Sequence, residues 1–460
     1  MASNGLAKQI FATISASLSI FIAGCWLGWP AATTDKFLNH QTGIEVTYPQ
    51  LSWIVSCMDI GNVLSPIPAG FLMDRFGRKK TVIFLGPVFI VSWALPVFLN
   101  HIWALYLARF LGGVGKGVSY TVVPIFLGEI AGVKIRGALS SVFTIQLAAG
   151  MLFELVVGPI VTYKTLNAIS AVVPVLFFIL FIWIAESPYY LLKNGRRDQA
   201  AKCLGWYRAG DDSELQLMEA TVQEEMMNKG TYSELFTNKK NLKVLFIVVS
   251  ACFSQRAGGV SSLIAFGSLS LPDPSPLVSK SNYIVLFGIL HVALSFVGMS
   301  LVDVVGRKPL LILSEASLGV ITFVYGLYFY VGMYTDVSQY NWVPYACYEM
   351  FSVMYALGVG FIPVVFLGEM LPVNVRAHGS AVMSIALAFS SLVSNKMYLF
   401  VSTTYGFHVI LWVYTVVNLV CAFLAYKMAL ETKGKTFLEI QNMLENSGKN
   451  GSEGKINAKT

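Results

Sequence analysis

The chain has 460 residues, of which 55% are hydrophobic and 12% charged, and its mean hydropathy is +0.65. This composition excludes an ordinary soluble globule and indicates a membrane protein. The formal net charge of +7 follows from the topology predicted below, so no nucleic-acid partner is needed to explain it.

Apolar stretches long enough to cross about 30 Å of hydrocarbon, roughly 20 helical residues each, recur along the whole chain. In order they lie at about 10–31, 52–72, 81–99, 103–127, 138–162, 167–185, 243–268, 282–302, 308–333, 343–368, 378–402 and 406–429. We therefore expect an all-α membrane protein with about twelve transmembrane helices. The first stretch lacks a convincing cleavage site and is expected to be retained.

Basic residues set the predicted orientation. With both termini in the cytoplasm, Lys36, Lys164 and Lys280 are the basic residues that fall in outside loops, and most other Lys and Arg fall in inside segments. The positive-inside rule therefore favours cytoplasmic termini.

Motifs in the first half of the chain recur at corresponding places in the second half. The pairs are DRFGRK (74–79) with DVVGRK (303–308), FLGEIAGVKIR (126–136) with FLGEMLPVNVR (366–376) and, more faintly, ESP (186–188) with ETKG (431–434). Such a duplication is typical of a secondary transporter made of two six-helix halves.

Four regions are expected along the chain. Residues 1–185 form an N-terminal six-helix bundle and residues 243–430 a C-terminal one. The polar stretch 186–242 is predicted to form short amphipathic helices on the cytoplasmic face. Residues 431–460 form a cytoplasmic tail that is expected to be partly disordered, because its last part has almost no apolar content.

The repeated motifs place acids beside arginines at the inner mouth of both halves. One interpretation of this charged cluster is that its basic residues only fix the topology and contact lipid headgroups. Topology alone, however, requires no acidic residues. Opposite charges at the seam between the halves are predicted to form a latch. Such a latch holds the inner side closed and breaks when that side opens.

Taken in order, the motifs resemble those of the sugar porter family of the major facilitator superfamily, most of all its insect trehalose and hexose transporters. The matching segments are DRFGRK, RFLGGVGKG, PIFLGEIA with RGAL, ESP, VDVVGRK, GVGFIP with the Glu and Arg that follow it, and ETKG. The resemblance implies two six-helix bundles around a central cavity, a sugar held near the bilayer midplane and alternating access. It also implies an inner gate network of Asp74, Arg75, Arg78, Glu129, Arg136, Glu186, Asp303, Arg307, Glu369, Arg376 and Glu431.

Binding a polyhydroxylated ligand requires amides and hydroxyls at mid-membrane depth, with aromatic faces for the apolar side of the ring. In SQRAGGVSS (254–262), Gln255, two glycines and Ser262 are spaced to share one face of a continuous helix. The resemblance places a Gln-Gln-x-Ser-Gly motif here, with Gln255 at its second Gln and Ser254 in place of its first. Val260 stands where the family has an Asn, so the pocket is expected to be atypical.

Other family positions are also changed. Thr144 stands at the position of a Gln in the fifth span, His291 at that of an Asn in the eighth, and Val364 replaces a Trp in the tenth. Helix-to-helix hydrogen bonding and, for tryptophans, anchoring at the membrane interface are the alternative roles. The candidate sugar contacts are Gln255, Gln146, His291, Thr144 and Ser254, with Trp26 and Trp29 as aromatic walls.

Ionisable residues inside the apolar stretches are costly and usually functional. Asp59 of the second stretch is predicted to pair with Lys116 or Arg109 of the fourth, because an unpaired charge there is expensive. Arg256 and Glu154 have no evident partner in the sequence.

Proton-coupled sugar porters are similar to this chain but carry an Asp in the first span, two residues after a Gly, where Trp26 follows Gly24. We therefore expect facilitated diffusion of trehalose or a hexose. Proton symport through Asp59 or Glu154 and a non-transporting sugar sensor are the alternatives. The sequence has no nucleophile elbow, metal-spaced His/Cys set or phosphate-binding loop, so no enzyme activity, cofactor or metal is predicted. The expected partners are a small-molecule sugar and the bilayer of the plasma membrane.

Overall fold

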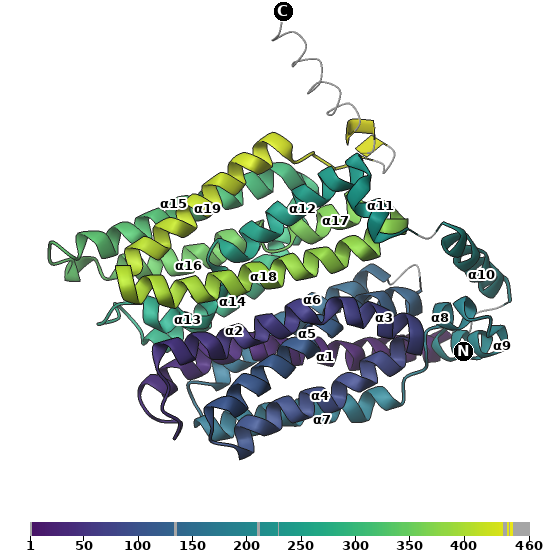
Figure 1. Cartoon of the computed structure of the whole chain (residues 1–460), viewed down its shortest axis with the longest axis horizontal. Coiled ribbons are helices and arrows are strands. Elements are labelled where there is room, and N and C mark those ends of the chain that lie inside the picture. Colours follow the sequence, from purple (N-terminus) through teal and green to yellow (C-terminus); the bar gives the residue numbers. More distant parts are fainter. Residues whose placement is uncertain are drawn as a thin grey trace, which may run out of the picture.

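The computed structural model describes residues 2–132, 136–208, 212–228, 230–435, 439–440 and 442–444. Its regular elements in this part of the chain are helices, arranged as two bundles that lie side by side, with their helices running along the long axis of the molecule (Figure 1). The expected disorder of the tail concerns residues that lie mostly outside the described ranges.

Seven helices are described in the N-terminal half. They are α1 (Ala2–Leu38), α2 (Tyr48–Leu64), α3 (Pro66–Phe76), α4 (Arg78–Phe98), α5 (Ile102–Ile130), α6 (Arg136–Val157) and α7 (Tyr163–Ile182). Helices α2 and α3 form one bent span with an angle of 45° between them. The bend lies at Pro66, because proline lacks an amide hydrogen and its ring clashes with the preceding turn.

The C-terminal half is built in the same way but has two broken spans. Its helices are α12 (Lys239–Ala257), α13 (Val260–Ser270), α14 (Lys280–Val305), α15 (Arg307–Val331), α16 (Trp342–Leu357), α17 (Ile362–Met370), α18 (Val373–Tyr405) and α19 (Phe407–Met428), with a 3₁₀ turn at Ser338–Tyr340. The pairs α12–α13 and α16–α17 are each interrupted by a few residues.

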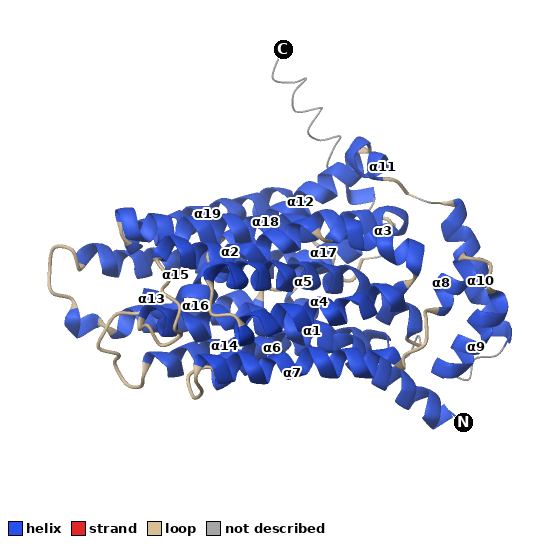
Figure 2. Cartoon of the chain, turned by 60° about the horizontal axis from the view of Figure 1, so that its bottom comes forward, coloured by secondary structure: helices blue, strands red, loops and turns tan. Residues whose placement is uncertain are grey.

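Between the halves lie four short helices. They are α8 (Pro188–Lys193), α9 (Arg197–Arg208), α10 (Asp212–Met227) and α11 (Tyr232–Thr237). Helices α8 to α10 share a small apolar core that includes Leu191, Leu204 and Leu215. These linker helices lie at the end of the molecule where α1 begins (Figures 1 and 2). We call this the linker end and the opposite one the far end.

The prediction of an all-α membrane protein is confirmed. Ten helical segments of the described chain are long and apolar enough to cross a membrane, and the bent pair α2–α3 makes eleven. The remaining predicted stretch, 138–162, corresponds to a shorter apolar helix at Val142–Val157.

Helix packing repeats between the two halves. Helix α4 packs on α5 and α7 in the first half, as α15 packs on α16 and α19 in the second, and α1 packs on α6 as α12 packs on α18. The halves meet where α2 contacts α18, α6 contacts α14 and α1 contacts α13. If the two halves are exchanged, the second span (α2) takes the place of the eighth (α14), and the fifth span (α6) takes the place of the eleventh (α18). The contact between α2 and α18 then becomes the contact between α14 and α6. This pattern fits two copies related by a two-fold axis.

Candidate functional site

A cavity of about 170 Å³ lies between the two halves, which is room for several water molecules at once. Both halves contribute to its wall. The polar side chains in the wall are Asp59 of α2, Arg109 of α5, Thr144 of α6, Gln255 and Arg256 of α12, Ser261 of α13, His291 and Ser295 of α14, Tyr355 of α16, and Ser391 and Asn395 of α18.

Two helix breaks face this cavity. Gly259, with φ +116°, separates α12 from α13, so the predicted continuous stripe from Gln255 to Ser262 does not form. The structure corrects that expectation: Gln255 and Ser261 line the cavity, whereas Ser262 is buried and bonds Ser394 at 2.9 Å. Irregular backbone at membrane depth is tolerated where it lines a cavity.

The second break, between α16 and α17, lies opposite the first. The Gln255 amide Nε2 donates to the carbonyl oxygen of Gly360 at 2.6 Å, which ties the two breaks together. Its Oε1 atom is buried without a partner. Gln255 is therefore held in place by one end of its amide, while the other end has no partner among the described residues.

The structure brings three of the predicted sugar contacts to the cavity wall. Gln255, Thr144 and His291 line it, while Gln146 and Ser254 do not. The His291 ring stacks on Tyr355 with centroids 5.4 Å apart, and its Nδ1 atom has no partner. Ser254 is buried away from the cavity wall, and its hydroxyl has no hydrogen-bond partner among the described residues.

Trp26 and Trp29 do not form aromatic walls of the cavity, contrary to expectation. Trp26 is fully buried and stacks on Trp93 with centroids 4.0 Å apart. The Trp29 indole Nε1 donates to Asn167 at 2.8 Å. Both rings pack inside the N-terminal half because Arg109 lies over them, at 5.4 and 5.6 Å from their centroids.

The predicted intramembrane ion pair is also corrected. Asp59 makes no contact within 4.0 Å with Lys116 or Arg109; it accepts a hydrogen bond from Asn395 Nδ2 at 2.9 Å, across the interface between the halves. Arg109 instead donates to the backbone carbonyls of Ile54, Val55 and Trp26. Those carbonyls satisfy the guanidinium, so it needs no carboxylate partner.

Asn395 was missed by the sequence reasoning. The signal for it was the polar run SNK (394–396) inside an otherwise apolar stretch. Glu154, which had no evident partner, accepts a hydrogen bond from Ser170 at 2.5 Å. Arg256 still has none among the described residues.

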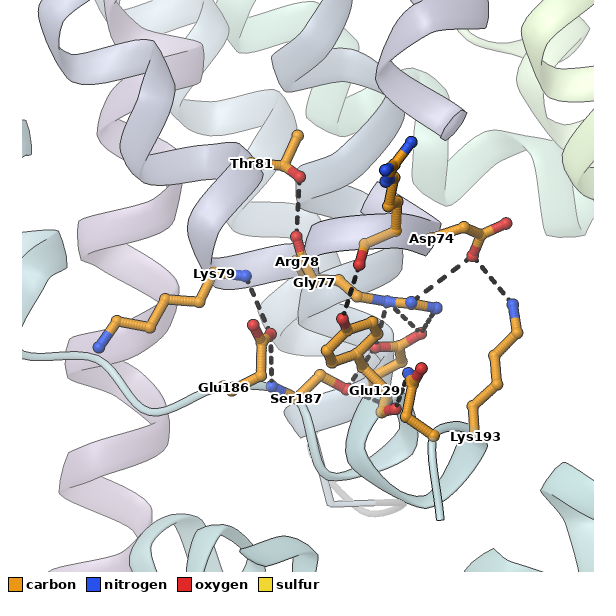
Figure 3. Close-up of polar contacts among 12 residues, drawn as sticks. Asp74, Gly77, Arg78, Lys79, Thr81, Glu129, Glu186, Ser187 and Lys193 are labelled. Atoms are coloured by element: carbon orange, nitrogen blue, oxygen red, sulfur yellow. Dashed lines mark hydrogen bonds and ion pairs between the residues drawn. The ribbon is translucent and has the colours of Figure 1, made fainter. Parts of the chain in front are cut away.

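At the linker end, the charged motif of the N-terminal half forms a compact network (Figure 3). The Arg78 guanidinium is nearly buried and donates to both oxygens of Glu129, with Nη2 to Oε1 at 2.7 Å and Nε to Oε2 at 3.0 Å. The Ser187 hydroxyl donates to the same carboxylate. Asp74 contributes less to the stability of this network, because its side chain is half exposed and its Oδ1 atom lies 3.7 Å from Arg78 Nη1.

Glu186 has a different role in this network. Its Oε1 atom accepts from the backbone N–H of Lys79 at 2.9 Å, so it caps the start of α4 where the helix dipole favours negative charge. Gly77, with φ +99°, allows this approach, because a Cβ atom there would lie 2.3 Å from Glu186 Oε2 (Figure 3). Only glycine combines that backbone conformation with so close a neighbour.

The C-terminal half repeats this arrangement, except that Arg307 donates to Oε1 of Glu369 alone. Arg307 Nη2 donates to Glu369 at 2.8 Å and contacts Asp303 at 3.0 Å. Thr432 donates to Glu369 as Ser187 does to Glu129. Glu431 caps α15 through the N–H of Arg307 at 3.1 Å, next to Gly306 with φ +104°. The match of ESP with ETKG, faint in the sequence, is therefore close in structure.

Three arginines of the predicted gate network lie outside these contacts. The Arg75 guanidinium lies over the rings of Phe71 and Phe76 rather than on a carboxylate. Arg376 donates to the carbonyl of Leu371 in its own half. The side chain of Arg136 lies outside the described part of the structure.

The predicted latch across the seam is not formed in this structure. Among the gate residues with described side chains, each arginine–carboxylate pair closes within its own half, and Asp74 also pairs with Lys193 of the linker helix α8 at 2.9 Å. Contacts between the halves lie toward the far end instead. There the Lys396 ammonium lies 3.3 Å from the centroid of Trp53, and an apolar cluster joins Ala31, Met151 and Leu155 to Ile284.

The sequence model of the family described as sugar (and other) transporter matches residues 11–444. The chain belongs to this family. The transporter is 28% identical over 445 residues to the facilitated trehalose transporter Tret1 of Polypedilum vanderplanki, covering 95% of this chain and 88% of the relative. It is 29% identical over 452 residues to Tret1 of Culex quinquefasciatus, covering 95% and 87%.

The fold of the transporter is similar to that of the xylose transporter XylE from E. coli. A partially occluded inward-open conformation of XylE gives a TM-score of 0.74 at 19% identity, covering 94% of this chain and 100% of the other. The proton:xylose symporter XylE bound to 6-bromo-6-deoxy-D-glucose gives 0.71 at 19% identity, covering 96% and 99%. Family membership confirms the sugar porter resemblance and identifies a multi-pass membrane transporter rather than an enzyme.

Proposed function

We propose that the transporter catalyses facilitated diffusion of a sugar, trehalose or a hexose, by alternating access. The observation that carries this proposal is the cavity between the halves, where Gln255 Oε1, Ser261 Oγ and His291 Nδ1 have no partner. Buried polar atoms without partners are costly, and sugar hydroxyls both donate and accept hydrogen bonds. The transporter lies in the plasma membrane with the linker end and both termini in the cytoplasm, as the distribution of Lys and Arg favours.

The inner gate network acts in this cycle by stiffening each half. At the linker end, Arg78 with Glu129 joins α4 to α5, and Arg307 with Glu369 joins α15 to α17. Each half then rocks as a body, and the far-end contacts part when the cavity opens to the outside.

Uniport is supported by the residues that α1 presents to the cavity, which are Leu27 and Pro30. Neither titrates, so α1 supplies no proton carrier. Proton symport is the second candidate, favoured by the position of Asp59 in the cavity wall. Reconstituted vesicles with and without an imposed pH gradient separate the two: accumulation above equilibrium that a protonophore abolishes establishes symport.

The test of sugar transport is uptake of a radiolabelled sugar panel by transporter-deficient cells. Gln255→Ala is expected to raise KM for the transported sugar about tenfold, the size of one lost hydrogen bond to a buried group. Gln146→Ala, away from the cavity wall, is the matched control and is expected to leave KM within twofold. If no sugar of the panel enters, the proposed function is wrong.

A further inference from the structure

Arg256 is an unpaired cation in the wall of the central cavity. It is the penultimate residue of α12, directly before the break at Gly258 and Gly259. Among the described residues, its guanidinium has neither an ion-pair partner within 4.0 Å nor a hydrogen-bond acceptor. Arg109 shares the wall but is already satisfied by backbone carbonyls.

Further positive charge lies behind the wall. Lys116 of α5 is 5% exposed and has no carboxylate within 4.0 Å, yet lies close enough to Arg256 and Asp59 to interact with both. Asp59 is the acid among the described residues that line the cavity. Glu154 does not line it and is bonded to Ser170.

Two arginines, Arg109 and Arg256, therefore line the cavity against one carboxylate. In a site of low dielectric constant, charges a few ångströms apart interact far more strongly than in water, and an excess charge at membrane depth is costly. A neutral ligand that fills the cavity displaces water from Arg256 and supplies no countercharge. A ligand with one negative charge, in contrast, neutralises the excess positive charge of the cavity wall.

The backbone also contributes positive electrostatic potential to the cavity. Helix α13 begins at Val260, and both Val260 and Ser261 line the cavity. The N–H groups of a first helical turn have no partner within the helix, and the N-terminus carries partial positive charge. The Ser261 hydroxyl is 8% exposed and has no partner. Half-helix N-termini at a break near the midplane hold anionic substrate groups in other transporters.

We propose that the cavity binds an acidic sugar, a hexose derivative with one carboxylate or phosphate, in preference to the neutral sugar of the same shape. The acidic group lies between Arg256, Ser261 and the N-terminus of α13. The sugar hydroxyls face Gln255, Asn395 and Asp59. This inference rests on the proposed function, sugar transport through this cavity, and narrows its substrate class.

The experiment compares uptake of D-glucuronate, D-glucose 6-phosphate and D-glucose into proteoliposomes that contain the full chain. The wild type is expected to show at least a tenfold lower KM for one of the two anionic probes than for D-glucose. The probe with the lower KM tells whether the acidic group is a carboxylate or a phosphate.

Arg256→Gln is expected to abolish this preference by raising KM for the anionic probe at least tenfold. Arg256→Lys keeps the charge and is expected to retain part of the preference. Lys164→Gln, an exposed cation in α7, makes the same change of net charge away from the cavity and is expected to have no effect.

Thermal unfolding of the wild type in detergent gives a second readout that needs no variant. At matched ionic strength, the anionic probe is expected to raise the unfolding midpoint more than D-glucose does, because a ligand that binds the folded state stabilises it according to its affinity. Preference for D-glucose over both anionic probes in uptake and unfolding overturns the inference and leaves sugar transport intact. Failure of all three probes in both assays also overturns the inference, and the uptake panel of sugars described above then tests the proposed function separately.

Discussion

At the scale of single residues, the linker-end networks contain contacts of very different strength. Arg78 and Glu129 are nearly buried, with side chains 8% and 13% exposed, and form a bidentate pair. Asp74 is 53% exposed and contacts Arg78 at 3.7 Å. Removing one partner of a buried pair leaves an uncompensated charge, whereas an exposed pair contributes little.

We therefore expect Arg78→Ala to destabilise the transporter by about 3–5 kcal/mol and Asp74→Ala by less than about 1 kcal/mol. The midpoint of thermal unfolding of the purified proteins, followed by tryptophan fluorescence, measures both. Equal shifts for the two variants would contradict the assignment of the buried pair as the centre of the network.

Glu431 makes the stability of the C-terminal network depend on pH. Burial raises the pKa of Glu431, but backbone N–H donors, including those of Lys433, Arg307 and Lys308, outweigh it and hold this pKa below the ordinary value. A carboxylate with a lowered pKa in the folded state stabilises it above the unfolded-state pKa, about 4.3, and loses that effect as pH falls through the folded-state pKa.

The wild type is thus expected to unfold at a higher temperature than Glu431→Gln at pH 7, with the difference shrinking as pH falls below about 4.3. The measurement is the unfolding midpoint of both proteins between pH 3.5 and 7. A difference that stays constant over this range would show that the charge of Glu431 is not the stabilising feature.

At the scale of elements, the sequence predicts spans well and their interruptions poorly. Hydropathy reports where a chain crosses the membrane, because about 20 apolar residues are needed, but it does not report whether the helix continues through them. The pair Gly258–Gly259 was the available signal for a break. Assuming a continuous helix placed Ser262 in the cavity, whereas the break turns Ser261 toward it.

The break itself is open to a direct test. Gly259 has φ +116°, and a Cβ atom there would lie 2.8 Å from the Tyr414 ring, so an alanine is strained in both backbone and packing. We expect Gly259→Ala to lower sugar uptake at least tenfold at equal surface expression. Gly205→Ala, where a Cβ atom meets nothing within 4 Å, is the control and is expected to transport normally. Normal uptake by Gly259→Ala would mean that the break is dispensable.

At the scale of the whole molecule, the duplication was predictable and the orientation of side chains was not. The repeated motifs identified Arg78 and Arg307 as equivalent positions in the two halves, and likewise Glu129 and Glu369. This was possible because each motif encodes a local arrangement that both halves need. The role of Trp26 was not accessible in this way. An aromatic ring on a transmembrane helix faces either the bundle core or the cavity, and packing partners such as Trp93 and Arg109, distant in sequence, decide between them.

The arrangement of the halves predicts where the molecule must open. The arginine–carboxylate pairs at the linker end close within each half. At the far end, in contrast, α6 and α14 pack together and Leu155 lies beside Gly288: a Cβ atom on Gly288 would be 2.7 Å from Leu155 Cδ1. If access alternates, these two helices separate once in every cycle. A covalent link between them therefore stops the cycle without touching the cavity wall.

We expect the double variant Leu155→Cys with Gly288→Cys to lose sugar uptake on mild oxidation and to regain it on reduction. Each single variant, treated in the same way, controls for the six native cysteines and is expected to be insensitive to the oxidant. Uptake in proteoliposomes is measured together with the extent of cross-linking from a protease fragment assay. Full transport by quantitatively cross-linked protein would mean that the halves do not part at the far end, and that sugar moves by a route other than rocking of two rigid bundles.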